Sequence, residues 1–244
     1  MEAIKTINLR KEYKDIVAVD DLNLTIHEGE LFSLLGVNGA GKTTTIKMLS
    51  TLTIPTSGDA FIFGNSILKN KNKIKELIDV SMQETSIARK LTVDENIEFY
   101  ASLSGQNKQE IEESKKYLYD AFELDKVKHK QASKLSGGWQ RKLSVALALV
   151  TKPKILFLDE PTLGLDVISR RELWKTIKQL KGKMTIILTT HYMEEAEALS
   201  DRIGIMKDGK LLFVGTKEEM FEKTKMNNVE DSFINIVSGG ELDE

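Results

Sequence analysis

The first third of the chain is patterned as short apolar runs separated by charged and glycine-containing segments. Apolar side chains recur every two or three residues in 4–9 and 22–26, and a mostly apolar run occupies 31–35. These patterns predict three strands. Ser57-Gly58-Asp59 is interpreted as the end of a helical stretch that precedes a fourth strand at 60–63.

The middle of the chain changes to a helical period. From Val93 to Phe122 the apolar residues recur three or four positions apart, which is the spacing of one helix face. The polar segment 104–108 interrupts this pattern once. We therefore expect a helical insertion between two strand-rich parts of the chain.

Strands and helices alternate in the second half. The runs 155–158 and 186–188 are continuously apolar, as expected for central strands of a parallel sheet covered on both faces. Asp208-Gly209 is typical of a hairpin turn. The alternation predicts an α/β fold with a mostly parallel central sheet. The expected order is helix 139–150, strand 155–158, helix 168–180, strand 184–188, helix 192–199, and a hairpin of strands 203–206 and 211–214.

Composition removes several classes of protein. The 35 Lys+Arg against 37 Asp+Glu leave a net charge of −2, which argues against a protein that mainly neutralises nucleic acid. The absence of cysteine excludes disulfide scaffolds, zinc fingers, iron–sulfur clusters and thiol catalysis. The longest apolar runs fall far short of the roughly 18 to 20 residues that span a bilayer. We expect a globular chain that does not cross a membrane by itself.

A glycine-rich loop follows the strand predicted at 31–35. The segment 36–43 reads Gly-Val-Asn-Gly-Ala-Gly-Lys-Thr, fits G-x-x-x-x-G-K-[ST], and precedes a helix-compatible stretch. Glycines let the backbone N–H groups curl around phosphate oxygens, and the helix start adds its positive dipole end. Lys42 is expected to reach the β- and γ-phosphates, and the Thr43 hydroxyl to ligate Mg²⁺.

Two carboxylates follow the apolar run at 155–158. At the end of such a strand, Asp159 is expected to hold Mg²⁺ and Glu160 to activate the attacking water as a general base. The alternative is that the pair only begins a loop and faces solvent. The phosphate loop and the buried strand favour the first interpretation.

Leu135-Ser136-Gly137-Gly138-Trp139-Gln140-Arg141 lies shortly before that strand and resembles the L-S-G-G-Q signature of the ATP-binding subunits of ABC transporters. Further features of that family follow in order over nearly the whole chain. By resemblance, Tyr13 would stack on adenine, Gln83 would sense Mg²⁺, the segment 163–166 would be the D-loop, and His191 would be the switch histidine.

The resemblance implies a P-loop NTPase core with an N-terminal antiparallel β subdomain and a helical insertion. It implies one nucleotide-binding domain over 1–244, in which about 92–150 forms a helical subdomain with the signature. The expected catalytic residues are Glu160, His191 and Lys42, and the expected metal-binding residues are Thr43, Gln83 and Asp159. The expected nucleotide-binding residues are Tyr13, Gly36, Asn38, Gly39, Ala40, Gly41, Lys42, Thr43, Thr44, Gln83, Ser136, Gly137, Gly138 and Asp166.

Several alternatives stay open for these residues. Ser136 could only cap a helix, His191 could be a satisfied histidine near the core, and Tyr13 could be a surface aromatic. Trp139 departs from the signature, where the family has glutamine. ATP binding is expected to survive this change, whereas the turnover rate could differ.

The family's arrangement implies ATP and Mg²⁺ as ligands and a second copy of the chain, or a homologous ATPase, that closes each site with its signature. It also implies a membrane-spanning permease on another chain and a location at the cytoplasmic face of the membrane, or in the cytoplasm when unassembled.

The segments 189–197 and 229–233 resemble an exporter branch that includes drug-resistance systems. The alternatives are an importer ATPase, a relative acting on nucleic acid or ribosomes, and a protein that binds ATP only structurally. The chain has neither the long coiled-coil insertion nor the tandem domains of the nucleic-acid relatives.

Overall fold

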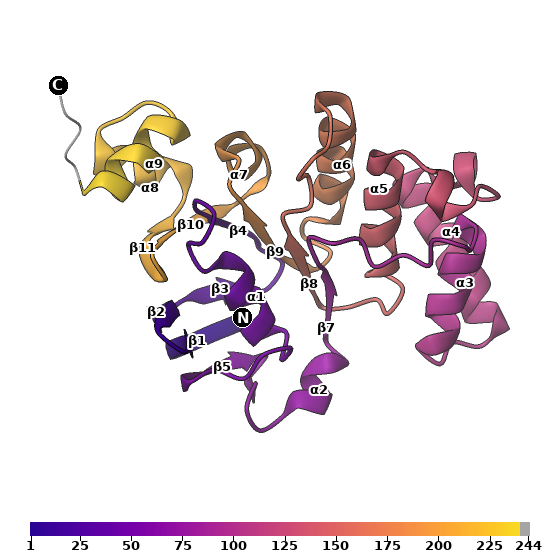
Figure 1. Ribbon diagram of the computed structural model, residues 1–244, viewed down its shortest axis with the longest axis horizontal. Coiled ribbons are helices and arrows are strands. Elements are labelled where there is room, and N and C mark those ends of the chain that lie inside the picture. Colours follow the sequence, from indigo (N-terminus) through magenta and orange to yellow (C-terminus); the bar gives the residue numbers. More distant parts are fainter. Residues whose placement is uncertain (240–244) are drawn as a thin grey trace.

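The computed structural model describes residues 1–239, and its strands form two sheets (Figure 1). The N-terminal sheet is antiparallel, as the family resemblance predicted. Its strand order is β2-β1-β5-β6, with β3 beside β1. Its strands are β1 (Glu2–Tyr13), β2 (Ile16–Leu22), β3 (Thr25–His27), β5 (Ser57–Ile62) and β6 (Asn65–Ser66).

The second sheet has the order β11-β10-β4-β9-β8-β7, and all of its neighbours are parallel except the β10–β11 hairpin. Every residue of β4, β8 and β9 is buried, which explains their apolar runs. The carboxyl ends of these strands therefore meet at one edge. The strands are β4 (Leu31–Leu35), β7 (Ile78–Ser81), β8 (Ile155–Asp159), β9 (Thr185–Thr190), β10 (Arg202–Lys207) and β11 (Lys210–Gly215).

The helices gather around this second sheet, with α3, α4 and α5 at one end of the molecule and α8 and α9 at the other (Figure 1). Thr92 and Asn107 each begin a helix through a capping box, which explains the break in the helical pattern. The helices are α1 (Lys42–Leu49), α2 (Lys71–Lys75), α3 (Val93–Leu103), α4 (Lys108–Phe122), α5 (Gly137–Leu147), α6 (Val167–Leu180), α7 (Met193–Leu199), α8 (Lys217–Thr224) and α9 (Val229–Ser238), with 3₁₀ turns at Leu124–Val127 and Ala132–Lys134.

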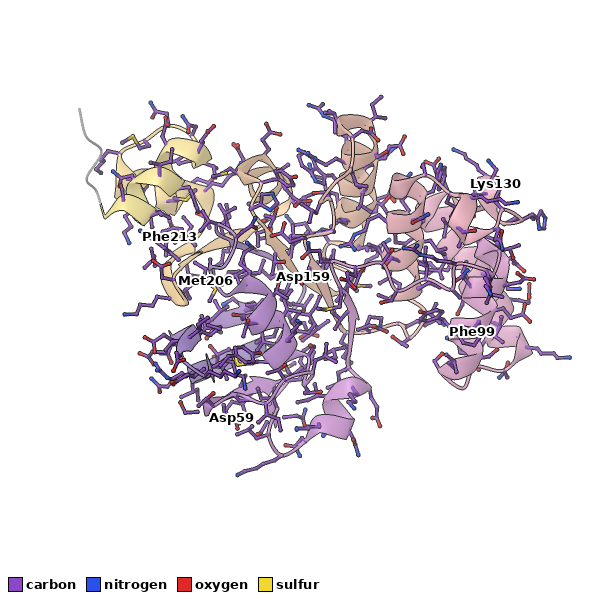
Figure 2. All side chains as sticks on the ribbon, in the orientation of Figure 1. Asp59, Phe99, Lys130, Asp159, Met206 and Phe213 are labelled. Carbon is purple, nitrogen blue, oxygen red and sulfur yellow. The ribbon has the colours of Figure 1, made fainter. Side chains whose placement is uncertain are left out.

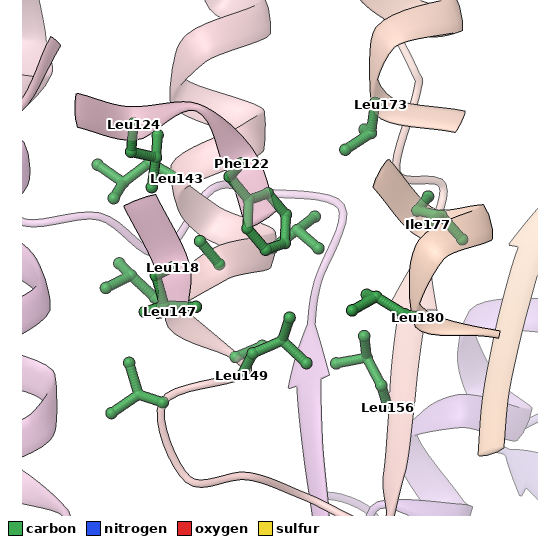
Figure 3. Close-up of a cluster of buried hydrophobic side chains, with 14 of the residues drawn as sticks. Leu118, Phe122, Leu124, Leu143, Leu147, Leu149, Leu156, Leu173, Ile177 and Leu180 are labelled. Carbon is green, nitrogen blue, oxygen red and sulfur yellow. The ribbon is translucent and has the colours of Figure 1, made fainter. Parts of the chain in front are cut away.

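One apolar cluster joins the helical end of the molecule to the parallel sheet. Figure 3 shows Leu118 and Phe122 of α4 on the same side as Leu147 of α5, facing Leu156 of β8 and Ile177 of α6. All five side chains are almost completely buried. A second cluster fills the space between the two sheets around α1. The helices α4 and α5 are thus packed onto the strand that carries Asp159.

Several element boundaries differ from the sequence prediction. Ser57-Gly58-Asp59 belongs to β5 rather than to a helix end, because Ser57 pairs with Arg10 and Asp59 with Ile7 of β1. Gly58 lies at the irregularity between these pairs, with a φ of +75°, where an added Cβ would lie 2.2 Å from the Asn8 carbonyl oxygen. The strand expected at 22–26 is two strands, since Asn23 leaves the ladder and accepts a hydrogen bond from the Asn8 amide.

The helix expected at 139–150 begins two residues earlier and ends at Leu147. The backbone of Ser136 is extended, as is usual for an N-cap residue, so the first helical residues are Gly137 and Gly138. Ser238 ends α9. The polar and acidic composition of 238–244 predicts a frayed tail, and most of that segment lies outside the described residues. Within residues 1–239, no helix combines the length and the apolar character needed to cross a bilayer.

Leu156→Ala tests the shared cluster. Leu156 is completely buried at the centre of it, so the truncation should lower the free energy of unfolding by about 2–5 kcal/mol. Leu103→Ala is the matched control because Leu103 is 70% exposed, and it should stay within about 0.5 kcal/mol of the parent. Urea titration followed by circular dichroism measures both. Equal losses would show that the cluster is not a tightly packed core.

Candidate active site

The loop 36–43 runs from the end of β4 to the start of α1. Gly41 is the N-cap of α1 with a φ of 104°, and a Cβ there would lie 2.3 Å from the Ala18 carbonyl oxygen. A Cβ on Gly36 would lie 2.4 Å from the Met206 carbonyl oxygen. These two positions therefore require glycine, and the loop is held close against β2 and β10.

Lys42 is buried at the base of this loop. Its ammonium donates hydrogen bonds to the carbonyl oxygens of Gly36 (2.8 Å) and Val37 (3.1 Å). It also lies 3.2 Å from Oε1 of Glu160. A positive charge is thus fixed at the base of the loop by groups that follow two strand ends, β4 and β8.

Asp159 ends β8 near the centre of the molecule (Figure 2). Its Oδ1 accepts hydrogen bonds from the hydroxyls of Thr43 (3.0 Å) and Thr189 (2.6 Å). Its Oδ2 is buried and has no hydrogen-bond partner among the described residues. A carboxylate oxygen in this condition requires a cation or a water, because a buried unpaired acceptor is costly. The Thr43 and Asp159 oxygens are also the hard ligands that Mg²⁺ prefers, so these residues fit that ion.

Glu160 occupies a strained position directly after Asp159. Its φ is +48°, and its amide donates to the Thr189 carbonyl and hydroxyl oxygens, both at 3.1 Å. Its carboxylate bridges Lys42 through Oε1 and Nδ1 of His191 through Oε2, the latter at 2.7 Å. The strain is held by the strand pairing and aims the carboxylate toward Lys42.

A cavity of about 540 Å³ opens in front of these groups. Ile16, Val17 and Ala18 form an apolar wall on one side, which the sequence reasoning did not identify. The available signal in the sequence was the short apolar run 16–19 between Asp15 and Asp20. The predicted residues that line the cavity are Asn38, Gly39, Ala40, Gly41, Lys42, Thr43, Thr44, Gln83, Glu160 and His191.

Other predicted residues lie away from the cavity lining. Tyr13 is 44% exposed at the end of β1, opposite Ile16, with the Lys11 ammonium 4.8 Å from its ring centroid. Asp166 caps α6 by accepting hydrogen bonds from the Ile168 and Ser169 amides. Gly36 lies beneath the loop against β10.

The signature segment also lies apart from the chain's own cavity. Ser136 is the N-cap of α5, but its hydroxyl makes no capping hydrogen bond. It is exposed, and Gly138 beside it packs against Ser169 of α6. The side chain and the first amides of α5 are therefore available to a ligand from outside this chain.

Trp139 does not take the place of the expected glutamine at the open helix end. Its ring packs against the apolar cluster, and the Lys142 ammonium lies 4.6 Å above it. Lys142 also pairs with Glu172 of α6 at 2.8 Å. Trp139 thus packs α5 against its neighbours, while Ser136 stays exposed at the start of the helix.

The sequence reasoning also missed Thr189 and Glu195. Thr189 donates to Asp159 from the adjacent strand, and a polar residue at the carboxyl end of a buried strand was its available signal. Glu195 is completely buried on α7 and accepts a hydrogen bond from the Trp174 indole of α6 at 2.9 Å. This bond joins the helix after Asp166 to the helix after His191.

A glycine-rich loop and a buried acidic strand end that face one cavity are typical of phosphate-loop nucleotide triphosphatases. Comparison with known proteins narrows this class: residues 19–163 match the family model described as ABC transporter. The chain therefore belongs to the ABC transporter family, as the signature predicted, and it is an ABC ATPase domain of that family.

Relatives and solved structures agree with this assignment. The chain is 45% identical over 223 residues to ABC transporter A family member 5 of Dictyostelium discoideum, covering 89% of this chain and 13% of that protein. It is 44% identical over 212 residues to the phospholipid-transporting ATPase ABCA3 of Homo sapiens, covering 87% of this chain and 12% of that protein. The chain thus spans about an eighth of the length of these relatives.

Among solved structures, part of a Clostridium perfringens ABC transporter complex superposes with a TM-score of 0.83 at 27% identity, covering 92% of each chain. A dimeric ATP-binding cassette in a post-hydrolysis state with ADP and Pi superposes with a TM-score of 0.78 at 28% identity, covering 87% of this chain and 98% of that chain. These neighbours confirm the fold that the sequence predicted.

Glu195→Gln should change how stability depends on pH. Burial raises the pKa of Glu195 above its ordinary value of 4.5, so the native state binds this proton more tightly than the unfolded state. The stability from the protonated carboxyl is present below pH 4.5 and is lost as pH rises toward the native pKa. The side-chain oxygen of glutamine can still accept the hydrogen bond from Trp174, and glutamine does not lose a proton as pH rises.

Urea titrations at pH 5 and pH 8 measure this effect. The free energy of unfolding of Glu195→Gln, relative to the parent, should be higher at pH 8 than at pH 5, by about 1.4 kcal/mol for each unit of pKa shift. Glu194→Gln changes the exposed neighbour and serves as the control. A difference that is the same at both pH values would contradict the raised pKa.

Proposed function

We propose that this chain hydrolyses ATP between two copies of the cassette and drives export through a membrane-spanning partner. The observation that carries the proposal is that Lys42, Glu160 and His191 are linked to one another and line one cavity. Asp159, which precedes Glu160, has a buried oxygen without a partner among the described residues. Lys42 neutralises phosphate oxygens, and Glu160 accepts a proton from the attacking water. His191 holds the Glu160 carboxylate in its orientation. The proposal treats 1–244 as one nucleotide-binding domain with its helical subdomain at about 92–150.

Lys42 has two roles in this mechanism. Its ammonium is attracted both by the loop carbonyls and by Glu160, and a triphosphate entering the loop competes with Glu160 for it. Once phosphate oxygens face Lys42, the Glu160 carboxylate is free to accept a proton from water. His191 keeps hold of the second carboxylate oxygen and so preserves its orientation. Substrate binding thereby exposes the base.

The metal site of the proposal uses oxygen ligands from three parts of the chain: the end of β8, the start of α1 and the turn after β7. Asp159 offers its unpartnered Oδ2, the Thr43 hydroxyl lies beside Oδ1, and Gln83 lines the same cavity. When bound, Mg²⁺ supplies positive charge to the phosphate oxygens as negative charge shifts during cleavage. Thr189 keeps Asp159 oriented toward this position through its 2.6 Å hydrogen bond.

A second copy, or a homologous ATPase, would complete each nucleotide site. The cavity already has its loop and its acidic wall, but Ser136, Gly137 and Gly138 lie outside it at an open helix end. In a head-to-tail pair these groups bind the terminal phosphate of the partner's nucleotide, and ATP links the two chains. One solved neighbour is a dimeric cassette by its title, which supports this arrangement.

Export of a lipid-like substrate is the transport function we favour. The exporter-like segments and the relative named as a phospholipid-transporting ATPase both support it. We place the chain at the cytoplasmic face of the membrane, docked on a permease that belongs to another chain. No nucleic-acid partner is expected, because the net charge of −2 gives no overall attraction to phosphate backbones.

Glu160→Gln tests the assigned base. The amide cannot accept the water proton, so phosphate release should fall by about 10²–10⁴-fold while MgATP still binds. Because ATP then persists at the interface, the variant should elute as a dimer in size-exclusion chromatography with ATP and Mg²⁺. Glu28→Gln, on the exposed turn after β3, should hydrolyse like the parent. Parental turnover by Glu160→Gln would remove Glu160 from this role.

Ser136→Arg tests whether the signature acts across two chains. Ser136 lies outside its own cavity, so ATP affinity measured on dilute monomer should stay within about threefold of the parent, whereas phosphate release should fall more than about tenfold. Lys42→Ala is the comparison, since it should weaken both binding and hydrolysis. Parallel losses of affinity and turnover in Ser136→Arg would contradict a role in the partner's site.

A further inference from the structure

Arg141 is a buried cation in the second turn of α5, and only 4% of it is exposed. It donates four hydrogen bonds, all to main-chain carbonyl oxygens. Nε binds Pro161 (2.7 Å), Nη2 binds Asp159 (2.9 Å), and Nη1 binds Met82 (2.6 Å) and Gln83 (3.1 Å). None of these acceptors is a carboxylate, so ion pairing alone does not explain the residue.

The four acceptors belong to two turns that carry site residues. One turn follows β8 and contains Asp159 and Glu160. The other follows β7, which is the edge strand of the sheet, and contains Gln83. In the described part of the chain, the hydrogen bond from Arg141 to the Gln83 carbonyl is the only one recorded for residues 83–85. The Gln83 turn therefore depends on Arg141 for its attachment to the Glu160 turn.

The chemistry of arginine suits this attachment. A guanidinium is a planar fork with five N–H donors, so one side chain can reach two turns at fixed angles, whereas a lysine ammonium is a point donor. Burial lowers the pKa of Arg141 to about 10, and the charges of Asp159, Glu195 and Glu160 oppose this shift. Arg141 therefore remains charged at neutral pH, and its hydrogen bonds are of the stronger, charge-assisted kind.

The position of Arg141 on α5 adds a second consequence. The same helix begins at Ser136 and Gly137, which lie outside the chain's own cavity. Because α5 is a rigid helix that carries both Arg141 and the open N-terminus, a movement of the two turns held by Arg141 also moves the start of α5. Lys142 is the adjacent buried cation, but it faces α6 through Glu172 and touches neither turn.

We propose that Arg141 is a positioning residue that fixes the Gln83 and Glu160 turns to each other and to the helix that serves the partner's nucleotide. Through it, a displacement of Gln83 is transmitted to the carboxylate that activates water and to the open end of α5. The inference deepens the proposed hydrolysis and rests on it, but the attachment itself is a property of the single chain.

Hydrogen exchange tests the attachment without any turnover. Amide exchange is measured by mass spectrometry on the full chain for peptides covering 82–88 and 159–163. The hydrogen-bonded amides of Ala88, Glu160 and Leu163 report the exchange in these peptides, because the amides of residues 83–85 donate no hydrogen bond within residues 1–239. In Arg141→Lys and Arg141→Gln, exchange in both peptides should accelerate at least about tenfold, because neither side chain can join the two turns. Lys142→Gln removes the neighbouring cation and should leave both peptides within about twofold of the parent. Arg141→Gln carries no buried charge, so it provides a folded test protein even if Arg141→Lys unfolds.

Steady-state kinetics and a double-mutant cycle test the functional part. Both Arg141 variants should lower kcat for ATP by at least about tenfold with KM within about threefold, since the residue acts through Gln83 and Glu160 rather than on ATP. Combining Arg141→Lys with Gln83→Ala should cost less than the product of the two single effects, because both changes disturb one pathway.

The outcomes separate this inference from the proposed function. Unchanged exchange in both peptides, or equal acceleration in Lys142→Gln, overturns the attachment. Accelerated exchange with parental kcat, or fully multiplicative effects in the cycle, overturns the transmission to Glu160. If the Lys42→Ala variant still released phosphate, the proposed hydrolysis would be overturned instead. The exchange results would then still decide whether Arg141 attaches the two turns to each other.

Discussion

The ion pair between the Lys42 ammonium and the Glu160 carboxylate is the interaction on which the site depends. Both groups are buried, and a buried charge without a partner is strongly destabilising. The loop carbonyls of Gly36 and Val37 and the imidazole of His191 satisfy the remaining donors and acceptors. An entering triphosphate must replace one member of this balanced set, so binding and the release of Glu160 are the same event in the proposed mechanism.

The parallel sheet makes this balance possible. Register pairs Leu35 with Thr190 and Asp159 with Thr189, so the carboxyl ends of β4, β9 and β8 stop at one level. Each of these three strands then delivers a different group to the same cavity. Ligand sites in parallel α/β sheets form at such carboxyl ends for the same reason. Thr189 and Asp159 are consequently neighbours in space although 30 positions separate them along the chain.

The helical end of the molecule adds a second level of organisation. Leu118 and Phe122 pack with Leu147 and Leu156, so the helix with the signature is built onto the strand with Asp159 by a continuous apolar cluster (Figure 3). Polar contacts then set the finer geometry. Arg141 spans the two turns, and the Trp174–Glu195 hydrogen bond joins α6 to α7. Apolar packing holds the parts together, and directional hydrogen bonds decide their angles.

The sequence by itself determined the local features: the glycine loop before α1, the apolar strand before Asp159, the alternation of strands and helices from α5 to β11, and the family. Each of these is encoded by neighbouring residues, whose spacing reflects backbone conformation and burial. Only the tertiary structure decided that β5 begins at Ser57 and that Arg141 reaches Met82 across 59 positions. Main-chain carbonyls accept these long-range contacts, and every residue has a carbonyl, so no pattern of side chains could have revealed them.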